Sequence, residues 1–383
     1  MNKSLAFETK AVRGTRCGED ATGSISFPIY LSTTFKHIGL NESTGYDYSR
    51  LQNPTREELE NTLATLENGK EGMAFSTGVA AVTAVLHLFK PKNHIILSDD
   101  LYGGTYRLFQ NIYNEYGLEV TFVDTTNVNN IEKNLRENTK GVFIETPSNP
   151  MMKVADIKAI SKLCREKRII SIVDNTFLTP YFQKPLDLGA HVVVHSGTKY
   201  LGGHNDALAG FVVSSDEEII NRIRLIQKST GACLSPFDSW LILRGIKTLH
   251  IRLKSAQNNA MKIAKWLKNQ KGIEKVYYIG LEEHEGYNIT KKQCSGFGSM
   301  ISIKTESVEL AHKILSKVKI ISFAESLGGV ESLITYPFTQ THSEIPEAIK
   351  KSLGVDERLL RLSVGIEEVN DLIEDLNEAI NGL

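Results

Sequence analysis

Short apolar segments alternate with amphipathic stretches between residues 73 and 213, and this alternation constrains the fold more than any other feature. Continuous apolar runs are typical of strands that are buried on both faces, and the stretches between them have helical spacing. The alternation predicts a large, doubly wound, mostly parallel α/β sheet covered by helices. We expect its strands at 73–75, 94–97, 119–123, 141–145, 169–173, 191–195 and 209–213.

The pattern changes outside this region, which predicts further units. After about Asp216 strands and helices no longer alternate strictly, which favours a smaller C-terminal α+β domain. Before residue 56, glycines and prolines interrupt any long periodicity, so this arm would pack on something else, a neighbouring subunit being one candidate. The expected division is an arm at 1–55, a large domain at 56–235 and a C-terminal domain at 236–383.

Local signals predict several helix boundaries. Thr55 and Glu58 have the spacing of a capping box, so a helix is expected to begin with Thr55 as its N-cap. Another helix is expected over 104–116. A long helix is expected over 245–271, with an interruption or bend within it.

The segment 191–203, HVVVHSGTKYLGG, contains Lys199 just after a predicted buried strand. Open α/β sheets bind ligands at the carboxyl ends of their strands, and a partly desolvated lysine amine there can attack carbonyls. The hydroxyls of Ser196 and Thr198 suit a phosphate. A lysine and phosphate ligands in one turn are what a pyridoxal phosphate (PLP) enzyme needs, although a single lysine is most often an ordinary solvated one.

Two other segments could bind an anion. Residues 73–75, a Ser-Thr-Gly turn at 76–78 and a helix from Val79 predict a phosphate cradle at a helix N-terminus. The patterns of a P-loop and of a dinucleotide fingerprint are absent from it. Residues 46–55, YDYSRLQNPT, place two tyrosines and Arg50 near a turn, which fits an anion-binding tip or an ordinary surface loop.

Polar residues follow several predicted strands at the same edge of the sheet. Glu145 is followed by TPSNP, which includes Asn149, and Asp174 follows another strand. Tyr102 lies a few residues after the strand at 94–97. One such residue is commonly a cap or a turn former, but several at one edge predict a binding site.

Arg361 lies in a predicted apolar strand, LLRLSVG, where an unpaired charge would be costly. It could bind the carboxylate of a substrate through two hydrogen bonds, or it could form a structural ion pair. The residues alone favour neither interpretation.

Composition excludes several classes of protein. The net charge of −1 gives no support for a nucleic-acid or membrane partner. The start, MNKSLAFETKAVRG, has no apolar core of a signal peptide, and no apolar run reaches the roughly 18 residues of a membrane span. The four cysteines lie far apart without a CxxC pair, so we expect no disulfide framework, no metal site and a cytoplasmic location.

Taken together, these motifs resemble the Cys/Met-metabolism PLP enzymes, the trans-sulfuration group of cystathionine γ-synthases, cystathionine β- and γ-lyases, methionine γ-lyases and homoserine-ester sulfhydrylases. The resemblance covers essentially the whole chain. It rests on eight motifs in the order and spacing of the family: YSRLQNPT, FSTGVAA, LYGGTYRLF, ETPSNP, VDNTF, HSGTKYLGGHND, AESLGGVESL and LRLSVG.

The resemblance implies roles around the cofactor ring. Lys199 would hold PLP and, once released by substrate, carry protons between carbon atoms. Asp174 would pair with the pyridine nitrogen and keep the ring protonated as an electron sink. Tyr102 would stack on the ring face, and Asn149 would donate to the phenolic oxygen.

The resemblance also implies the remaining ligands. The cofactor phosphate would be held by N–H groups or hydroxyls of Gly78, Val79, Ser196 and Thr198, and by Tyr48 and Arg50 of a neighbouring subunit. The substrate would contact Tyr48, Glu325, Ser326 and Arg361, with Arg361 binding the α-carboxylate. The implied fold is that of aspartate aminotransferase, usually a tetramer of two intimate dimers. Val79 departs from the methionine most common in the family, with little expected loss because the contact is through the backbone.

The reaction follows less directly from the sequence. A glutamate at the position of Glu325 accompanies cystathionine as substrate or product in resembling enzymes, and 334–342, ITYPFTQTH, is most similar to bacterial cystathionine lyases and synthases. We therefore expect β- or γ-elimination of L-cystathionine, with homocysteine or cysteine as other substrates. The alternatives are γ-replacement by a cystathionine γ-synthase or O-acylhomoserine sulfhydrylase, a non-catalytic PLP-fold protein, and a dehydrogenase, which the missing glycine fingerprint disfavours.

Overall fold

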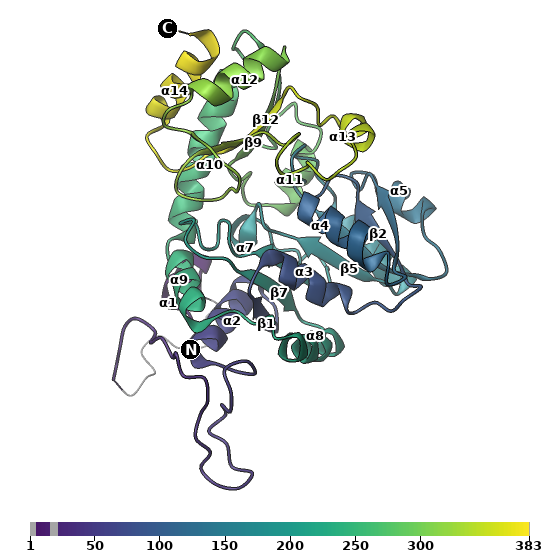
Figure 1. Cartoon of the computed structure of the whole chain (residues 1–383), viewed down its shortest axis with the longest axis vertical. Coiled ribbons are helices and arrows are strands. Elements are labelled where there is room, and N and C mark those ends of the chain that lie inside the picture. Colours follow the sequence, from purple (N-terminus) through teal and green to yellow (C-terminus); the bar gives the residue numbers. More distant parts are fainter. Residues whose placement is uncertain (1–4, 16–21, 383) are drawn as a thin grey trace.

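The computed structural model describes residues 5–15 and 22–382 of the chain. Figure 1 shows a large sheet and a smaller sheet in different parts of the molecule, with the long helix α10 (Leu249–Leu267) running from one part to the other. Within the described residues, none of the helices combines the length and apolar character that crossing a bilayer requires.

The large sheet has the strand order β1-β7-β6-β5-β4-β2-β3. Its neighbouring strands from β6 to β3 are parallel, which confirms the predicted doubly wound sheet. Strand β7 is antiparallel to both of its neighbours, because the segment 197–209 returns from β6 without a crossover helix. The strands are β1 (Glu71–Phe75), β2 (His94–Ser98), β3 (Glu119–Val123), β4 (Thr139–Glu145), β5 (Ile170–Asp174), β6 (Val192–Ser196) and β7 (Gly210–Ser214).

Side chains of the central strands pack into different apolar clusters on the two faces of the sheet. Val192 and Val194 belong to one cluster and Val193 to another, as the alternation of side chains along a strand requires. This two-sided burial is the reason for the continuous apolar runs in the sequence. The helices of this part are α2 (Pro54–Glu67), α3 (Gly78–Leu86), α4 (Gly103–Leu108), α5 (Val128–Lys133), α6 (Ile157–Lys167), α7 (Thr179–Phe182) and α8 (Glu217–Thr230).

The predicted capping box at Thr55 is wrong, because α2 begins earlier. Asn53 is the N-cap, and its side chain accepts hydrogen bonds from the N–H groups of Thr55 (3.0 Å) and Arg56 (3.4 Å). Pro54 occupies the first helical position, which suits its fixed φ. The Thr55 hydroxyl instead donates to the carbonyl of Pro28 and holds the arm against α2.

Two other predicted helices are divided. The stretch predicted as one helix over 104–116 forms α4 followed by a π-helical turn, η1 (Phe109–Tyr113). The predicted long helix over 245–271 is interrupted as expected, but the break comes near its start. Helix α9 (Pro236–Ile246) ends there, and α10 begins at Leu249.

The second sheet has the order β10-β11-β12-β9-β8 and is mostly antiparallel. Its helices and β12 bury an apolar cluster of their own, which fits the predicted α+β unit. The short strands β10 and β11 were not predicted, because they are too brief to have a period. The elements are β8 (Ile273–Tyr277), β9 (Met300–Thr305), β10 (Ser322–Phe323), β11 (Leu333–Thr335), β12 (Leu359–Ser363), α11 (Tyr287–Gln293), α12 (Val308–Lys317), α13 (Glu347–Leu353) and α14 (Val369–Asn381).

The N-terminal segment lies partly apart from both sheets. After α1 (Phe7–Arg13), the described residues 22–53 contain isolated bridges but no helix or longer strand. Figure 1 shows this purple segment extending away from the body before α2. Its glycines and prolines explain the lack of regular structure.

Candidate active site

A cavity of about 380 Å³ lies at the carboxyl ends of the large sheet, where the second part of the chain faces it. Every predicted site residue except Tyr48 and Arg50 lines it. The lining residues that were predicted are Gly78, Val79, Tyr102, Asn149, Asp174, Ser196, Thr198, Lys199, Glu325, Ser326 and Arg361. The cavity therefore brings together residues from both sheets, as a catalytic cleft between two structural layers would.

Lys199 follows β6 and enters the cavity from the large sheet. Its Nζ donates a hydrogen bond to the Ser326 hydroxyl at 2.9 Å. Burial, and then the positive charge of Arg361, lower the pKa of Lys199 to about 8, while Glu325 acts in the opposite direction. An amine with this pKa is neutral far more often near pH 7 than an ordinary lysine, so it can act as a nucleophile or a base.

Asp174 ends β5 and faces the same cavity. Its carboxylate accepts hydrogen bonds from the N–H group (3.0 Å) and the hydroxyl (2.6 Å) of Thr176. Burial raises its pKa, whereas Thr176 and the charge of His195 lower it. Glu145 pairs with Asp174 across β4 and β5, and burial together with the charge of Asp174 holds the pKa of Glu145 well above its usual range. Two buried carboxyl groups side by side favour a cationic group near them.

The first turn of α3 forms the predicted anion cradle. The Thr77 hydroxyl caps the helix by accepting from Ala80 N–H at 3.0 Å, and first-turn N–H groups such as those of Gly78 and Val79 have no acceptor within the helix. A Cβ atom on Gly78 would lie only 3.0 Å from the Cβ of Ser196. Glycine therefore lets the helix N-terminus approach the Ser196 turn closely enough for both to contact one phosphate.

Arg361 is buried in β12 without a carboxylate partner among residues 5–15 and 22–382. Its guanidinium donates to Asn149 Oδ1 (2.7 Å), the Ser326 carbonyl (2.9 Å) and the Thr335 hydroxyl (3.2 Å), while Nε has no hydrogen-bond partner. Burial lowers its pKa to about 10. All three acceptors are neutral groups, whereas the negative charges of Glu145 and Glu325 act from further away and raise the pKa of Arg361. Binding of a substrate carboxylate by Arg361 stays a prediction.

Asn149 is held from two sides. Its side-chain oxygen accepts from Arg361, which leaves the NH₂ group as the half of the amide that can donate into the cavity. Its carbonyl lies 3.0 Å from His342 Nε2. Burial and the charge of Arg361 lower the pKa of His342 to about 4, so this histidine is neutral and its Nε2–H donates to the carbonyl.

Tyr102 precedes α4, and 41% of its surface is exposed toward the cavity and solvent. Its N–H group donates to Glu145 Oε2 at 2.8 Å. Glu145 and Thr176 line the cavity but were not predicted as site residues, although both follow directly from strand-end motifs. Thr341 was missed as well, and only the folding of its loop against α4 brings it there.

Tyr48 and Arg50 lie at the base of the arm, in the turn that leads into α2, outside this cavity. Both side chains are exposed, and the Arg50 guanidinium lies 5.6 Å from the centre of the Tyr48 ring. Arg50 Nη1 also donates to the Lys228 carbonyl at 2.6 Å. Within one chain, the structure does not bring these residues to the other predicted site residues.

A larger cavity, of about 560 Å³, lies near β8 and the segment after Pro150. Two of the lysines that line it form ion pairs, Lys153 with Asp99 at 3.1 Å and Lys268 with Glu283. It contains none of the predicted site residues, so the smaller cavity is the candidate active site.

Comparison with known proteins agrees with this geometry. Residues 8–381 match the model of the Cys/Met metabolism PLP-dependent enzyme family. The chain is 46% identical to a cystathionine gamma-lyase of Bacillus subtilis, over 98% of this chain and 99% of that protein. It is also 46% identical to a cystathionine gamma-synthase of Haemophilus influenzae, over the full length of both. Sequence identity therefore does not separate elimination from replacement.

A solved structure shows the same fold. The crystal structure of a cystathionine gamma-lyase from Lactobacillus plantarum complexed with L-serine superposes with a TM-score of 0.96. That protein is 41% identical to this chain, and the match covers 99% of each.

Proposed function

We propose that this chain, which belongs to the Cys/Met metabolism PLP-dependent enzyme family, cleaves L-cystathionine by β- or γ-elimination. As a member of that family, it is a PLP-dependent enzyme that acts on C–S bonds. The observation that carries the proposal is the single cavity in which Lys199, Asp174 and Arg361 converge. Homocysteine and cysteine are expected as further substrates.

The residues of the cavity fit PLP. The α3 N-terminus with Ser196 and Thr198 would hold the phosphate. At position 78 any residue other than glycine would place its side chain in the narrow space beside Ser196. The buried carboxylate of Asp174 would pair with the ring nitrogen, Asn149 would donate to the ring oxygen, and Tyr102 would cover a ring face. When bound, PLP supplies the electron sink for negative charge on the substrate α-carbon.

Lys199 would bind the cofactor and then move protons. With a pKa of about 8, its amine can accept the α-proton and return a proton to another carbon atom or to the leaving group. The Ser326 hydroxyl, 2.9 Å away, would orient the amine. Arg361 would bind the substrate α-carboxylate, and Glu325 would face the distal amino group of cystathionine.

Tyr48 and Arg50 would complete the phosphate site of a neighbouring subunit, and Tyr48 would also contact substrate there. Their exposure and their distance from the cavity of their own chain support this assignment. It requires at least a dimer, and we propose a homotetramer of two such dimers. We also propose the predicted division of the chain into an arm at 1–55, a large domain at 56–235 and a C-terminal domain at 236–383.

A cytoplasmic location is also proposed. The thiols of Cys164, Cys233 and Cys294 are free, as in a reducing compartment, and Cys17 lies outside the described residues.

A second candidate function is γ-replacement, in which cysteine attacks an activated homoserine ester. The identity of 46% to a cystathionine gamma-synthase favours it as much as the lyase. The two routes differ by small changes in geometry, worth a few kcal/mol in relative barriers.

One experiment separates these reactions. Purified protein with PLP is given L-cystathionine, and separately an O-acylhomoserine with cysteine. Pyruvate from cystathionine indicates β-elimination, and 2-oxobutyrate indicates γ-elimination. New cystathionine from the second mixture, with neither keto acid from the first, would replace the lyase proposal with γ-replacement.

A further inference from the structure

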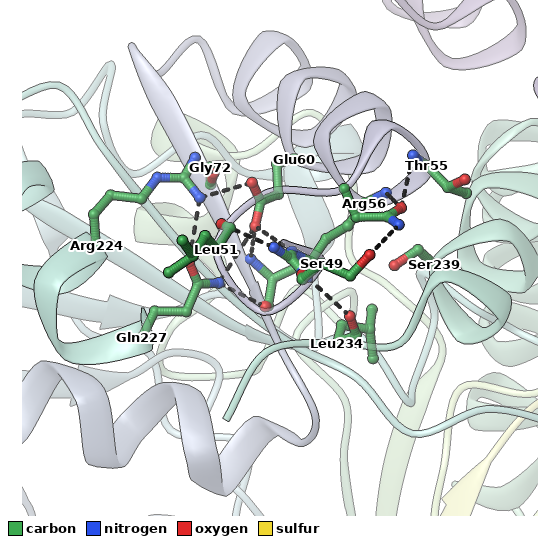
Figure 2. Close-up of polar contacts among 12 residues, drawn as sticks. Ser49, Leu51, Thr55, Arg56, Glu60, Gly72, Arg224, Gln227, Leu234 and Ser239 are labelled. Atoms are coloured by element: carbon green, nitrogen blue, oxygen red, sulfur yellow. Dashed lines mark hydrogen bonds and ion pairs between the residues drawn. The ribbon is translucent and has the colours of Figure 1, made fainter. Parts of the chain in front are cut away.

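Arg56 lies beneath the turn at the base of the arm that carries Tyr48 and Arg50, and only 2% of its surface is exposed. Its Nη1 donates to the Ser49 carbonyl at 2.7 Å, and its Nη2 donates to the Leu51 carbonyl at 3.0 Å. These two carbonyls flank Arg50, so one guanidinium holds the backbone on both sides of it. Figure 2 shows Arg56 reaching from α2 to this turn.

The other side of Arg56 is anchored to the large sheet through Glu60. Nε of Arg56 lies 3.7 Å from Glu60 Oε1, one helical turn further along α2. Glu60 also accepts from the N–H of Ala74 in β1 (2.8 Å) and from Arg224 of α8 (2.7 Å), as Figure 2 shows in part. Gln227, also of α8, donates to Glu60 and to the Ala74 carbonyl. Arg56 thus links the turn to the rigid core.

The same network contacts both segments that are proposed to bind phosphate, the cradle at Gly78 and the turn that carries Tyr48 and Arg50. Strand β1, which Glu60 contacts, leads directly into the anion cradle at Gly78 of the same chain. The turn that Arg56 holds carries Tyr48 and Arg50, whose side chains are exposed. Fixing the backbone beneath exposed donors lowers the entropy lost when they bind an anion.

A purely structural role explains only part of this arrangement, such as the hydrogen bond from Arg56 Nη1 to the Leu234 carbonyl at 3.5 Å. Burying a guanidinium is costly, and an apolar side chain could pack α2 against the core without that cost. The two hydrogen bonds instead fix the peptide group before Arg50 and the one after Leu51. The segment that carries Arg50 is thus held at both ends, as a donor needs when it must reach another chain's ligand in a set direction.

We propose that Arg56 is a positioning residue that presents Tyr48 and Arg50 to the phosphate of PLP in the neighbouring subunit. The inference rests on the proposed function, in which the arm acts in a second copy of the chain. Arg56 itself touches neither cofactor nor substrate.

The first test compares Arg56→Gln and Arg56→Lys with the wild-type holoenzyme. Lysine keeps the charge but cannot donate to both carbonyls in the geometry of the fork, and it covers the case in which the glutamine variant does not fold. We expect both variants to lose PLP more readily, and activity at limiting PLP to fall about tenfold, as for the loss of one charge-assisted contact to the phosphate. Unchanged PLP affinity in a folded Arg56→Lys protein would overturn the proposal.

Arg224→Gln is the matched control. Arg224 binds the same Glu60 but contacts the Gly72 carbonyl and Glu71 rather than the turn. We expect this variant to unfold at a lower temperature while its PLP dissociation constant stays close to the wild-type value. A loss of PLP affinity equal to that of Arg56→Lys would show that general destabilisation, and not positioning of the turn, explains both results.

The decisive test mixes variant subunits at limiting PLP, where the Arg56→Lys protein has little activity by itself. In a hybrid of Arg56→Lys with Lys199→Ala, one site has the intact Lys199 of the first chain and the intact arm of the second. Random mixing at equal amounts should restore roughly a quarter of the wild-type activity, because half of the dimers are hybrids with one intact site each. A defect confined to the fold of the Arg56→Lys subunit would not be repaired by its neighbour.

A parallel mixture of Arg50→Ala with Lys199→Ala distinguishes the role of Arg56 from the role of the arm between subunits. If this mixture regains activity and the Arg56→Lys mixture does not, the role of Arg56 is wrong and the proposed function stands. If neither regains activity, the arm does not act between subunits, and that part of the proposed function fails together with the inference about Arg56.

Discussion

The strand-end cavity and the turn at the base of the arm both carry predicted anion-binding groups, but they present them in opposite ways. In the cavity, Arg361 is buried, Lys199 and Asp174 are half-buried, and the charge of Arg361 helps to lower the pKa of Lys199 within one chain. In the turn at the base of the arm, the side chains of Tyr48 and Arg50 are exposed, and the buried Arg56 binds the backbone next to them. The cavity therefore brings most of the predicted site residues together within one chain, whereas the proposed role of Tyr48 and Arg50 requires a ligand in a second copy.

The largest effect is expected from removing the amine at the centre of the cavity. Lys199→Ala should lower turnover of L-cystathionine on the order of 10⁴-fold, because it removes both the nucleophile and the general base. Steady-state kinetics and the visible absorbance of bound PLP measure this. A variant that keeps both its colour after dialysis and its activity would remove Lys199 from the site.

Asp174→Asn tests the buried carboxylate on the other side of the cavity. It should leave PLP bound but slow α-proton exchange about 10²–10³-fold, because a neutral amide no longer favours the protonated ring. Deuterium exchange at the α-carbon, followed by NMR, measures the rate. Exchange at the wild-type rate would assign the electrostatic role to Glu145 instead, and Glu145→Gln is the matched variant.

Arg361→Ala tests whether the buried guanidinium binds substrate. We expect KM for amino-acid substrates to rise about 30-fold or more, since truncating a desolvated charge partner costs about 2–5 kcal/mol. Initial rates over a range of L-cystathionine concentrations give KM and kcat separately. If stability falls while KM stays constant, Arg361 is structural.

Arg50→Ala extends the comparison to the turn at the base of the arm. Loss of one charge-assisted contact to a phosphate should weaken PLP binding about tenfold or more, since such a hydrogen bond contributes about 1.5–3 kcal/mol. Equilibrium dialysis measures the affinity. An unchanged PLP affinity would show that the turn with Tyr48 and Arg50 is an ordinary surface loop.

The smallest expected effect is a shift in the pH at which the rate of PLP binding to the apoprotein is half of its maximum. Reaction of the apoprotein with PLP should speed up as pH rises and level off above the Lys199 pKa of about 8, because only the neutral amine attacks. The charge of Arg361 lowers that pKa, so Arg361→Ala should move the midpoint to higher pH, by less than about one unit. Stopped-flow absorbance across the pH range measures both midpoints, and a downward shift would contradict the electrostatic argument.

Local patterns in the sequence were enough for most of the large sheet and for one side of the site. The apolar runs, the Ser-Thr-Gly turn and Lys199 after a buried strand depend on neighbouring residues, whose spacing directly reflects secondary structure. The same reasoning failed at Thr55, where Pro54 moved the cap to Asn53, and at β7, whose direction depends on how the 197–209 segment returns.

The other side of the site was decided by tertiary structure. Arg361 and Asn149 are 212 positions apart in the chain, and Lys199 and Ser326 are 127 apart, yet each pair forms a hydrogen bond. By itself the sequence determined that Lys199 and Asn149 follow buried strands and that Arg361 lies within one, because burial imposes a period on a short segment. Only the packing of the second sheet against the first decided which of them share a cavity, because desolvation and charge depend on distance in space and not along the chain.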